Sequence, residues 1–259
     1  MQHRSTLALT AAVLALATAY AACSDSVTNP DKLVEVDGPT VSVGNGTARA
    51  VVMKRGNDVQ SVGIQLTDDA LINLPTTMPA TEWQLALPAG TDVGQWDHLA
   101  LDWNPQGHPP PMVYTVPHFD FHFYMITPAA QMAIQGGPDQ TPVPDQYVPQ
   151  DYASQVESVP MMGVHWADTL ATEYHGQPFD HTFIYGFHTG KMIFLEPMVT
   201  QAFLQGSTDF SGHVKQPAAF QTPGLYPTSY SVTHDAAHHT VTIALDSLAL
   251  HDVRLDATR

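Results

Sequence analysis

The sequence predicts a mainly β protein, built as a sandwich or as a barrel-like antiparallel sheet with a few short helices. Short runs that alternate apolar and polar side chains dominate the chain, and this period of two is typical of strands with one buried face. Apolar stripes with helical spacing are scarce, and 21 prolines would interrupt long helices. Neither an internal repeat nor a heptad pattern is present, so a single β-rich domain is expected over residues 39–259.

Turn signals divide the first half of the chain into short strands. Gly-Asn-Asp at residues 56–58 joins two alternating runs, which predicts a β-hairpin. Thr67 is a predicted N-cap for a short helix that ends before Pro75, and Pro128 is a favourable first residue for another helix. The predicted strands in this half cover residues 41–43, 47–54, 59–66, 82–87, 98–103 and 113–125.

The second half of the chain contains two further hairpin patterns. Residues 136–151 are rich in Pro, Gln and Asp and predict an exposed loop. Residues 179–197 predict a hairpin of two apolar and aromatic arms, with Thr189 and Gly190 at its tip. A last hairpin is expected over residues 230–246, with its tip near residues 235–238.

The N-terminus has the three-part pattern of an export signal. Arg4 supplies a positive charge, and residues 7–22 form an uncharged run rich in Ala and Leu that ends in small residues. Such a run is too short for a stable membrane span and is typical of a signal peptide. Residues 1–22 are therefore expected to be removed and are excluded from the fold.

Cys23 is the only cysteine, so the chain has no internal disulfide. The sequence Tyr-Ala-Ala before Cys23 resembles a bacterial lipobox, although Tyr20 stands where Leu is usual. We expect lipidation of Cys23, a polar tether over residues 23–38, and an extracytoplasmic lipoprotein held at the membrane through this anchor alone, in the periplasm or at the cell surface. The alternative is ordinary cleavage near Ala22 that leaves a free thiol.

The mature chain is strongly acidic. Because the signal peptide carries only Arg4, 25 acidic residues face 8 basic ones, and the formal charge becomes −17. This balance excludes nucleic acid and anionic lipid headgroups as partners and suits cations. The same acidity is also explained by a need to keep an exported protein soluble.

The segment 117–124 (Pro-His-Phe-Asp-Phe-His-Phe-Tyr) has the clearest candidate metal ligands. Alternation in a strand places His118, Asp120 and His122 on one face and the three Phe side chains on the other. Neighbouring residues on one face lie about 6.6 Å apart, so Asp120 and His122 could share an ion. His118 and His122 lie about 13 Å apart, so both could bind one ion only across a bulge or bend.

Two other segments supply further candidates. His165 follows a glycine, and Asp168 could orient its ring. In the hairpin, a two-residue turn at Thr189-Gly190 would pair Phe187 with Met192 and Phe183 with Glu196. His181 and Glu196 would then lie diagonally on one face. A glutamate in so apolar a stretch needs a partner, because burying it unpaired is costly.

We expect a mononuclear site on the inner face of a barrel, with His122, His165 and Glu196 as ligands. A fourth ligand would come from His118 or His181, while Asp120, Asp168 and Tyr185 would lie around the ligands.

Imidazole and carboxylate ligands suit Zn, Mn, Fe, Ni or Co. Copper held by histidines and thioethers is less favoured, because Met usually fills apolar gaps. The methionines in question are Met112, Met161, Met162, Met192 and Met198. The competing interpretation is that the 13 histidines of the mature chain are packing and hydrogen-bonding groups. No GxSxG, GxGxxG or P-loop motif is present, so no reaction is indicated.

Four strings in the chain resemble an uncharacterised bacterial family. They are GNGTARAVVMKRGNDVQSVGIQLTDDALINLP, PHFDFHFYMI, MGVHWAD and FDHTFIYGFHTGKMIFLEPMVTQAFL, and the resemblance extends over about residues 43–246. The family includes a Thermus protein controlled by an extracytoplasmic sigma factor. The resemblance implies a β-rich fold and a homo-oligomer, but no reaction or substrate. Ligand roles for the histidines and Glu196 come from the residues alone.

Three hypotheses about function follow from the sequence. The first is an extracytoplasmic metal-binding protein, whose metal would activate water or oxygen if the protein is an enzyme. The second is a non-catalytic envelope-stress or ligand-binding lipoprotein, with an unidentified small-molecule ligand. The third is a structural homo-oligomer in which the hairpins form the subunit contacts.

Overall fold

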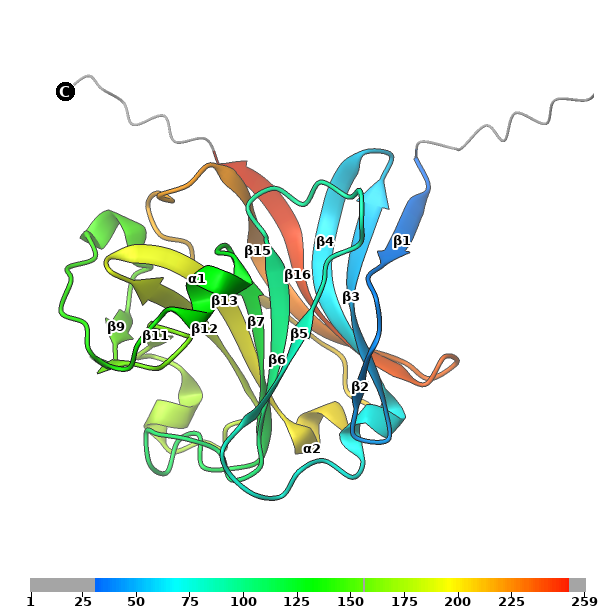
Figure 1. Cartoon of the computed structure of the whole chain (residues 1–259), viewed down its shortest axis with the longest axis horizontal. Coiled ribbons are helices and arrows are strands. Elements are labelled where there is room, and N and C mark those ends of the chain that lie inside the picture. The colour runs from blue at the N-terminus through cyan, green and yellow to red at the C-terminus, as the bar shows by residue number, and fades with distance from the viewer. Residues whose placement is uncertain (1–30, 156, 252–259) are drawn as a thin grey trace, which may run out of the picture.

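The computed structural model describes residues 31–155 and 157–251, so the predicted signal peptide and Cys23 lie outside the described residues. Two seven-stranded antiparallel sheets pack face to face (Figure 1). Sheet A consists of β1 (Leu33–Asp37), β2 (Val41–Val43), β3 (Gly46–Arg55), β4 (Asp58–Thr67), β14 (Phe210–His213), β15 (Gly224–Asp235) and β16 (Thr240–His251). Sheet B consists of β5 (Thr81–Leu85), β6 (His98–Asn104), β7 (His118–Tyr124), β9 (Tyr152–Ser154), β11 (Val164–Asp168), β12 (His181–His188) and β13 (Lys191–Thr200).

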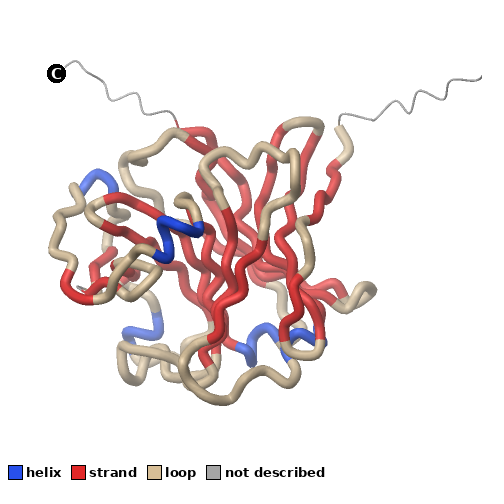
Figure 2. The backbone as a smooth tube through the Cα atoms, viewed as in Figure 1, coloured by secondary structure: helices blue, strands red, loops and turns tan. Residues whose placement is uncertain are grey.

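The prediction of a mainly β, sandwich-like fold is confirmed, and neither sheet closes into a barrel within the described residues. The strand order is β1-β3-β4-β16-β15-β14 in sheet A, where β2 also pairs with β3, and β5-β6-β7-β13-β12-β11-β9 in sheet B. A small separate pair joins β8 (Gly137–Pro138) to β10 (Glu157–Ser158). In Figure 2 helices are few and short beside the strands. They are η1 (Asp68–Leu71), α1 (Pro128–Met132), η2 (Asp145–Tyr147), η3 (Thr172–His175) and α2 (Gln201–Leu204).

The start of sheet A lies inside the predicted tether. Residues 33–37 form β1, which pairs antiparallel with β3, and the Gly38 backbone N–H donates to the Ala50 carbonyl over 2.8 Å. The predicted tether, residues 23–38, therefore overlaps the first strand. Alternation over only five residues is too short to indicate a strand in the sequence. Among the described residues, no helix is long and apolar enough to span a bilayer.

The main core lies between the two sheets. On β7 the rings of Phe119, Phe121 and Phe123 all face this core with no exposed surface, as period-two alternation predicts. Val62 and Ile64 of β4 meet them from sheet A. Burying large apolar side chains in this way contributes about 1.5–3 kcal/mol each relative to exposure.

Sheet B is unusual because its other face is buried as well. Every residue of β6 and every residue of β7 is buried, including the polar ones. A second apolar cluster covers this outer face and includes Tyr114, Ile134 and Phe179, which come from loops outside the sheet. Figure 1 shows α1 and the segments around β9 and β11 on this side of the molecule. The histidines and carboxylates of β6 and β7 are therefore enclosed on the face away from the sandwich core.

This arrangement corrects the expectation of a site on the inner face of a barrel. The three Phe side chains of β7 occupy the inner face, so His118, Asp120 and His122 must occupy the outer one. The sequence established which residues share a face, but not which face the loops would cover.

A bulge in the β12–β13 hairpin sets the orientation of Glu196. Thr189 and Gly190 form the tip with φ values of 48° and 76°, which suit a two-residue hairpin turn. Phe187 pairs with Met192 as predicted, but the register then shifts, and Glu196 lies opposite Ile184 rather than Phe183. A one-residue shift moves every later side chain to the other face of the sheet. Glu196 consequently points to the outer face, away from His181.

We predict that Gly186→Ala destabilises the protein by about 1–3 kcal/mol, because it overpacks the outer face of sheet B. A Cβ atom at Gly186 would lie 2.1–2.4 Å from ring carbons of Phe194. Denaturant unfolding of both single variants and the double variant Gly186→Ala/Phe194→Leu measures the coupling. The loss in free energy of unfolding caused by Gly186→Ala should be smaller when Leu replaces Phe194. If the losses of the two single variants simply add in the double variant, the clash is not the cause.

Candidate metal centre

Three side chains from β7, β11 and β13 converge on the outer face of sheet B, and we call His122, His165 and Glu196 the central cluster. The β13–β7 residue pairs before and after these two positions fix the register, which places Glu196 of β13 opposite His122 of β7. His165 of β11 lies two strands away from β13, and its partner on the intervening β12 is Gly186. Because Gly186 has no side chain, the Phe194 ring fits above it, against both His122 and His165.

The ligating atoms of the central cluster lie within 4.8 Å of one another. Glu196 Oε2 is 3.7 Å from His122 Nε2 and 3.6 Å from His165 Nε2. These separations are too long for hydrogen bonds. They are close to the separation of about 3.4 Å between ligand atoms that a tetrahedral ion with bonds of about 2.1 Å would impose.

The central cluster contains buried polar atoms that nothing satisfies. Glu196 is 1 % exposed and His122 is fully buried. Within the described part of the chain, both oxygens of Glu196 and Nε2 of His122 have no hydrogen-bond partner. A buried carboxylate without partners costs several kcal/mol, so this geometry calls for a cation or a proton at its centre.

Asp102 fixes the ring of His122, and sequence reasoning missed it. His122 Nδ1 lies 2.9 Å from Asp102 Oδ2, and a hydrogen bond to that carboxylate directs Nε2 toward Glu196. Carboxylate–histidine pairs of this kind orient the ligands of many metal sites. The strand 98–103 was predicted, but only the register of β6 and β7 places Asp102 opposite Asp120 and diagonal to His122.

Aromatic rings pack against the histidines of the central cluster and shield them from solvent. The Phe194 ring packs edge-on against His122 at 4.7 Å and against His165 at 5.3 Å, measured between ring centroids. Tyr124 stacks on the other side of His122 at 5.3 Å. The His165 side chain is about 10 % exposed, so the site is almost completely shielded from water.

Burial dominates the electrostatics of the central cluster. It raises the pKa of the Glu196 carboxyl above 4.5 and lowers the pKa of His165 to about 3, so His165 is neutral near pH 7. Burial also opposes a charged His122, but the carboxylates of Glu196 and Asp102 outweigh it and raise its pKa to about 9. The pKa of Asp102 is raised to about 6 by burial. Without a metal, the cluster therefore retains protons that a bound cation would displace.

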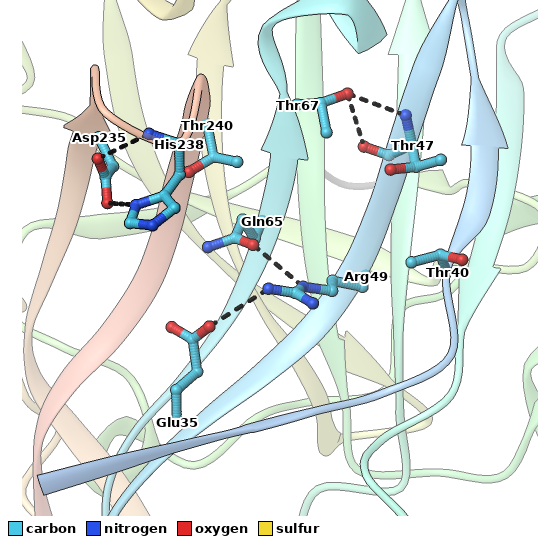
Figure 3. Close-up of a pocket in the computed structure, with 9 residues that line it drawn as sticks. All are labelled: Glu35, Thr40, Thr47, Arg49, Gln65, Thr67, Asp235, His238 and Thr240. Atoms are coloured by element: carbon cyan, nitrogen blue, oxygen red, sulfur yellow. Dashed lines mark hydrogen bonds and ion pairs between the residues drawn. The ribbon is translucent and has the colours of Figure 1, made fainter.

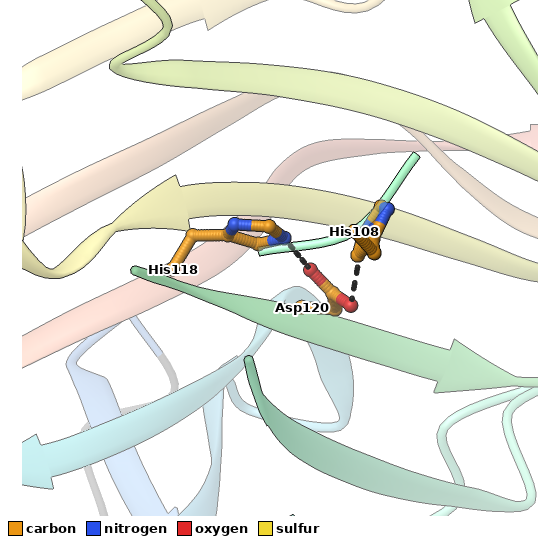
Figure 4. A group of neighbouring side chains, drawn as sticks. All are labelled: His108, His118 and Asp120. Atoms are coloured by element: carbon orange, nitrogen blue, oxygen red, sulfur yellow. Dashed lines mark ion pairs between the residues drawn. The ribbon is translucent and has the colours of Figure 1, made fainter. Parts of the chain in front are cut away.

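A second group, which we call the outer cluster, lies on the same face. It consists of His108, His118 and Asp120, and Figure 4 shows the two rings directed toward the carboxylate. Asp120 Oδ1 is 3.2 Å from His118 Nε2, and Asp120 Oδ2 is 3.6 Å from His108 Nε2. Asn104 of β6 donates to Asp120 Oδ2 over 2.7 Å. The loop residue His108 and Asn104 were both missed at the sequence level, since neither lies in a motif.

Two of the predicted ligands do not reach the central cluster. His118 belongs to the outer cluster, as its distance along the strand from His122 requires. His181 lies on the opposite face of sheet B, where its Nδ1 is 3.0 Å from the Tyr230 hydroxyl and its ring packs on Phe210. The bulge in the hairpin is the reason, because it separates His181 from Glu196.

The residues expected around the ligands are also dispersed. Asp168 pairs with Lys215 at 2.8 Å and faces away from His165. Tyr185 is in the core between the sheets, where its hydroxyl donates to the Lys215 carbonyl over 2.8 Å. Asp120 does lie on the same face as His122, but it is oriented toward the two other histidines.

The methionines are distributed over different parts of the fold. Met112 is 92 % exposed, Met192 lies in the core between the sheets, and Met198 lies in the second apolar cluster on the outer face of sheet B. This distribution does not assemble the three of them around a histidine.

A broad pocket with a cavity volume of about 590 Å³ lies on sheet A, far from these clusters in the fold (Figure 3). Its charged groups already have partners inside the protein. Arg49 is 2.7 Å from Asp37 and 3.3 Å from Glu35, and its Nε donates to Gln65 over 3.0 Å. The pocket therefore gives no sign of a missing ligand.

A family model described as TTHB210-like, "Hypothetical protein TTHB210", matches residues 58–103, which extend from β4 into β6. This match supports the resemblance to an uncharacterised Thermus family and includes Asp102, but it ends before the other cluster residues. Control by a sigma factor stays a prediction. Comparisons with curated proteins and with solved structures found no match.

We predict that the metal-free protein loses stability as the pH rises from about 6.5 to about 9. The folded-state pKa of His122 is raised from 6.5 to about 9, and that of His108 is also raised to about 9 through Asp120. Protonation of a histidine with a raised folded-state pKa stabilises the protein fully below pH 6.5. This contribution is lost as the pH rises through about 9. Each histidine would contribute at most about 3 kcal/mol.

The measurement is the melting temperature of chelator-treated protein across this pH range. His122→Gln should reduce the slope, whereas His239→Ala, at a side chain that is 81 % exposed, should leave it unchanged. A melting temperature that rises with pH in the parent protein would contradict the assignment.

Proposed function

We propose that this chain binds one divalent transition-metal ion through His122, His165 and Glu196. The observation that carries the proposal is that the unpartnered, buried carboxylate of Glu196 lies 3.6 and 3.7 Å from two imidazole nitrogens, close to the spacing of ligand atoms around a tetrahedral ion. One neutral imidazole, a second imidazole oriented by a carboxylate, and one glutamate form a chemically ordinary ligand set for such an ion.

A proton alone explains the central cluster less well than a metal ion does. A shared proton would draw Glu196 and one imidazole together to hydrogen-bond distance, about 2.7–2.9 Å for a charged pair. The atoms instead stand 3.6 and 3.7 Å apart, with Glu196 Oε2 about equally far from both rings. A symmetric gap of this size leaves room for an ion between the three groups.

Two histidines and one carboxylate narrow the identity of the ion without fixing it. This set serves zinc in hydrolases and iron(II) in oxygen-using enzymes, and it also accepts Mn, Ni or Co. Three protein ligands leave a position for a water molecule or another small ligand. Because the ligand atoms are almost fully buried, that fourth ligand must be small. A bound ion would supply activation of water or oxygen to any reaction at this site.

The first test is elemental analysis of natively purified protein, repeated after loading with Zn²⁺ and dialysis. We predict that Glu196→Gln removes about one metal equivalent per chain, because the amide keeps the shape of the carboxylate but not its charge. His239→Ala, an exposed histidine on another surface, is the matched control.

Circular dichroism should show that Glu196→Gln remains folded. A parent protein that keeps less than about a tenth of an equivalent after loading would refute the proposal. Equal metal content in the parent and in Glu196→Gln would show that the central histidines and Glu196 serve packing and hydrogen bonding only.

We further propose that the chain is exported and anchored to a membrane through lipidated Cys23. The support is the sequence pattern of residues 1–23, together with a domain whose first strand begins only ten residues later at Leu33. Such a short spacer would hold the domain close to the bilayer surface.

The prediction is that the expressed precursor is found in the membrane fraction, is released by detergent and resists a high-salt wash. Cys23→Ser should move the protein to the soluble fraction, because the acyl chains that hold it cannot be attached. Mass spectrometry of the N-terminal peptide identifies the modification, and a parent protein with a free Cys23 thiol would exclude the anchor.

A further inference from the structure

The outer cluster has the features of a second metal site. We propose that His108, His118 and Asp120 bind a further divalent transition-metal cation, separate from the ion of the central cluster. This inference does not depend on the central site, because the two clusters share no ligand.

The tautomers of the two histidines support this assignment. His118 Nδ1 lies 2.7 Å from the Val116 carbonyl, and His108 Nδ1 lies 2.7 Å from the Pro109 carbonyl. A carbonyl oxygen only accepts, so each Nδ1 carries the hydrogen. Nε2 of each ring is then the nitrogen left for a metal ion, which would displace any proton on it, and both Nε2 atoms face the carboxylate of Asp120.

An unprotonated Nε2 that faces a carboxylate repels it, so each of these nitrogens needs a proton or a metal ion between itself and Asp120. His118 is fully buried and Asp120 is 3 % exposed. Although 3.2 Å apart, His118 Nε2 and Asp120 Oδ1 make no hydrogen bond to each other or to any other described group. The remaining oxygen of Asp120 is held by Asn104, which orients the carboxylate and leaves Oδ1 free. A cation satisfies all three groups at once.

The local backbone holds the cluster in place. Gly107 has φ of 68°, and a Cβ there would lie 2.0 Å from the Tyr114 carbonyl oxygen, so only glycine fits the turn that presents His108. Phe179 packs edge-on against the His118 ring at 5.4 Å and closes the apolar side. The His108 side chain is 26 % exposed, so this cluster is reachable from solvent where the central one is shielded.

The two clusters would form neighbouring sites rather than one bridged centre. Asp120 and His122 are consecutive residues on one face of β7, about 6.6 Å apart. Bridged two-metal centres hold their ions about 3.5–4 Å apart with shared ligands. The outer face of sheet B would therefore carry two ions along one strand, each with two imidazoles and one carboxylate.

The test is a titration of the metal-stripped mature chain with Zn²⁺ near pH 7.5, followed by calorimetry and elemental analysis. The parent protein should bind two equivalents. Asp120→Asn and His108→Ala should each lose one equivalent and keep the other. His108 lies in a loop, so its variant preserves the test if a change at the buried Asp120 prevents folding. His239→Ala should keep both equivalents.

The outcomes separate this inference from the central site. Loss of one equivalent in His108→Ala and of a different one in Glu196→Gln, with none left in the double variant, supports both sites. If Glu196→Gln changes nothing while His108→Ala loses one equivalent, the outer site stands and the central site fails. Unchanged stoichiometry in His108→Ala and Asp120→Asn would overturn the outer site and show a histidine–aspartate ion pair instead.

Discussion

The site depends on one costly arrangement, the burial of the Glu196 carboxylate with neither oxygen hydrogen-bonded within the described chain. Its neighbours at 3.6 and 3.7 Å are imidazole nitrogens, and Asp102 directs one of them, His122 Nε2, at the carboxylate. A protein interior tolerates such a group only when an opposite charge compensates it or a proton neutralises it. A metal ion resolves the conflict for all three side chains, whereas a proton resolves it for one pair and leaves the spacing unexplained.

The rest of the fold serves to keep this arrangement dry and rigid. Sheet B uses its inner face for the sandwich core and its outer face for the polar clusters, so its central strands are buried on both sides. Segments outside sheet B cover its outer face, and Tyr114 and Phe179 are part of this apolar cover. Phe194 fills the space above Gly186, beside the histidines of the central cluster, without adding a polar group. Ligands on strands are held more precisely than ligands on loops, which suits the shielded central cluster, whereas His108 gives the outer cluster its access to solvent.

The sequence predicts much of the fold because its signals are local. Alternation identified the hairpin of β3 and β4, the segregation of histidines from phenylalanines on β7, and the turn at Thr189-Gly190. The three residues of the central cluster were also proposed as ligands from the sequence. Other parts depend on non-local facts: the bulge that turns Glu196 away from His181, the register that brings Asp102 to His122, and the loops that bury the outer face. A period-two pattern says which residues share a face, but it contains no information about what covers that face.

The measurement that tests the central claim most directly is anomalous X-ray diffraction from crystals of natively purified protein, recorded on both sides of the absorption edge of the metal found by elemental analysis. The account predicts an anomalous peak about 2.0–2.2 Å from His122 Nε2, His165 Nε2 and a Glu196 oxygen. The absence of a peak, with the Glu196 side chain turned to a hydrogen-bond partner, would contradict it.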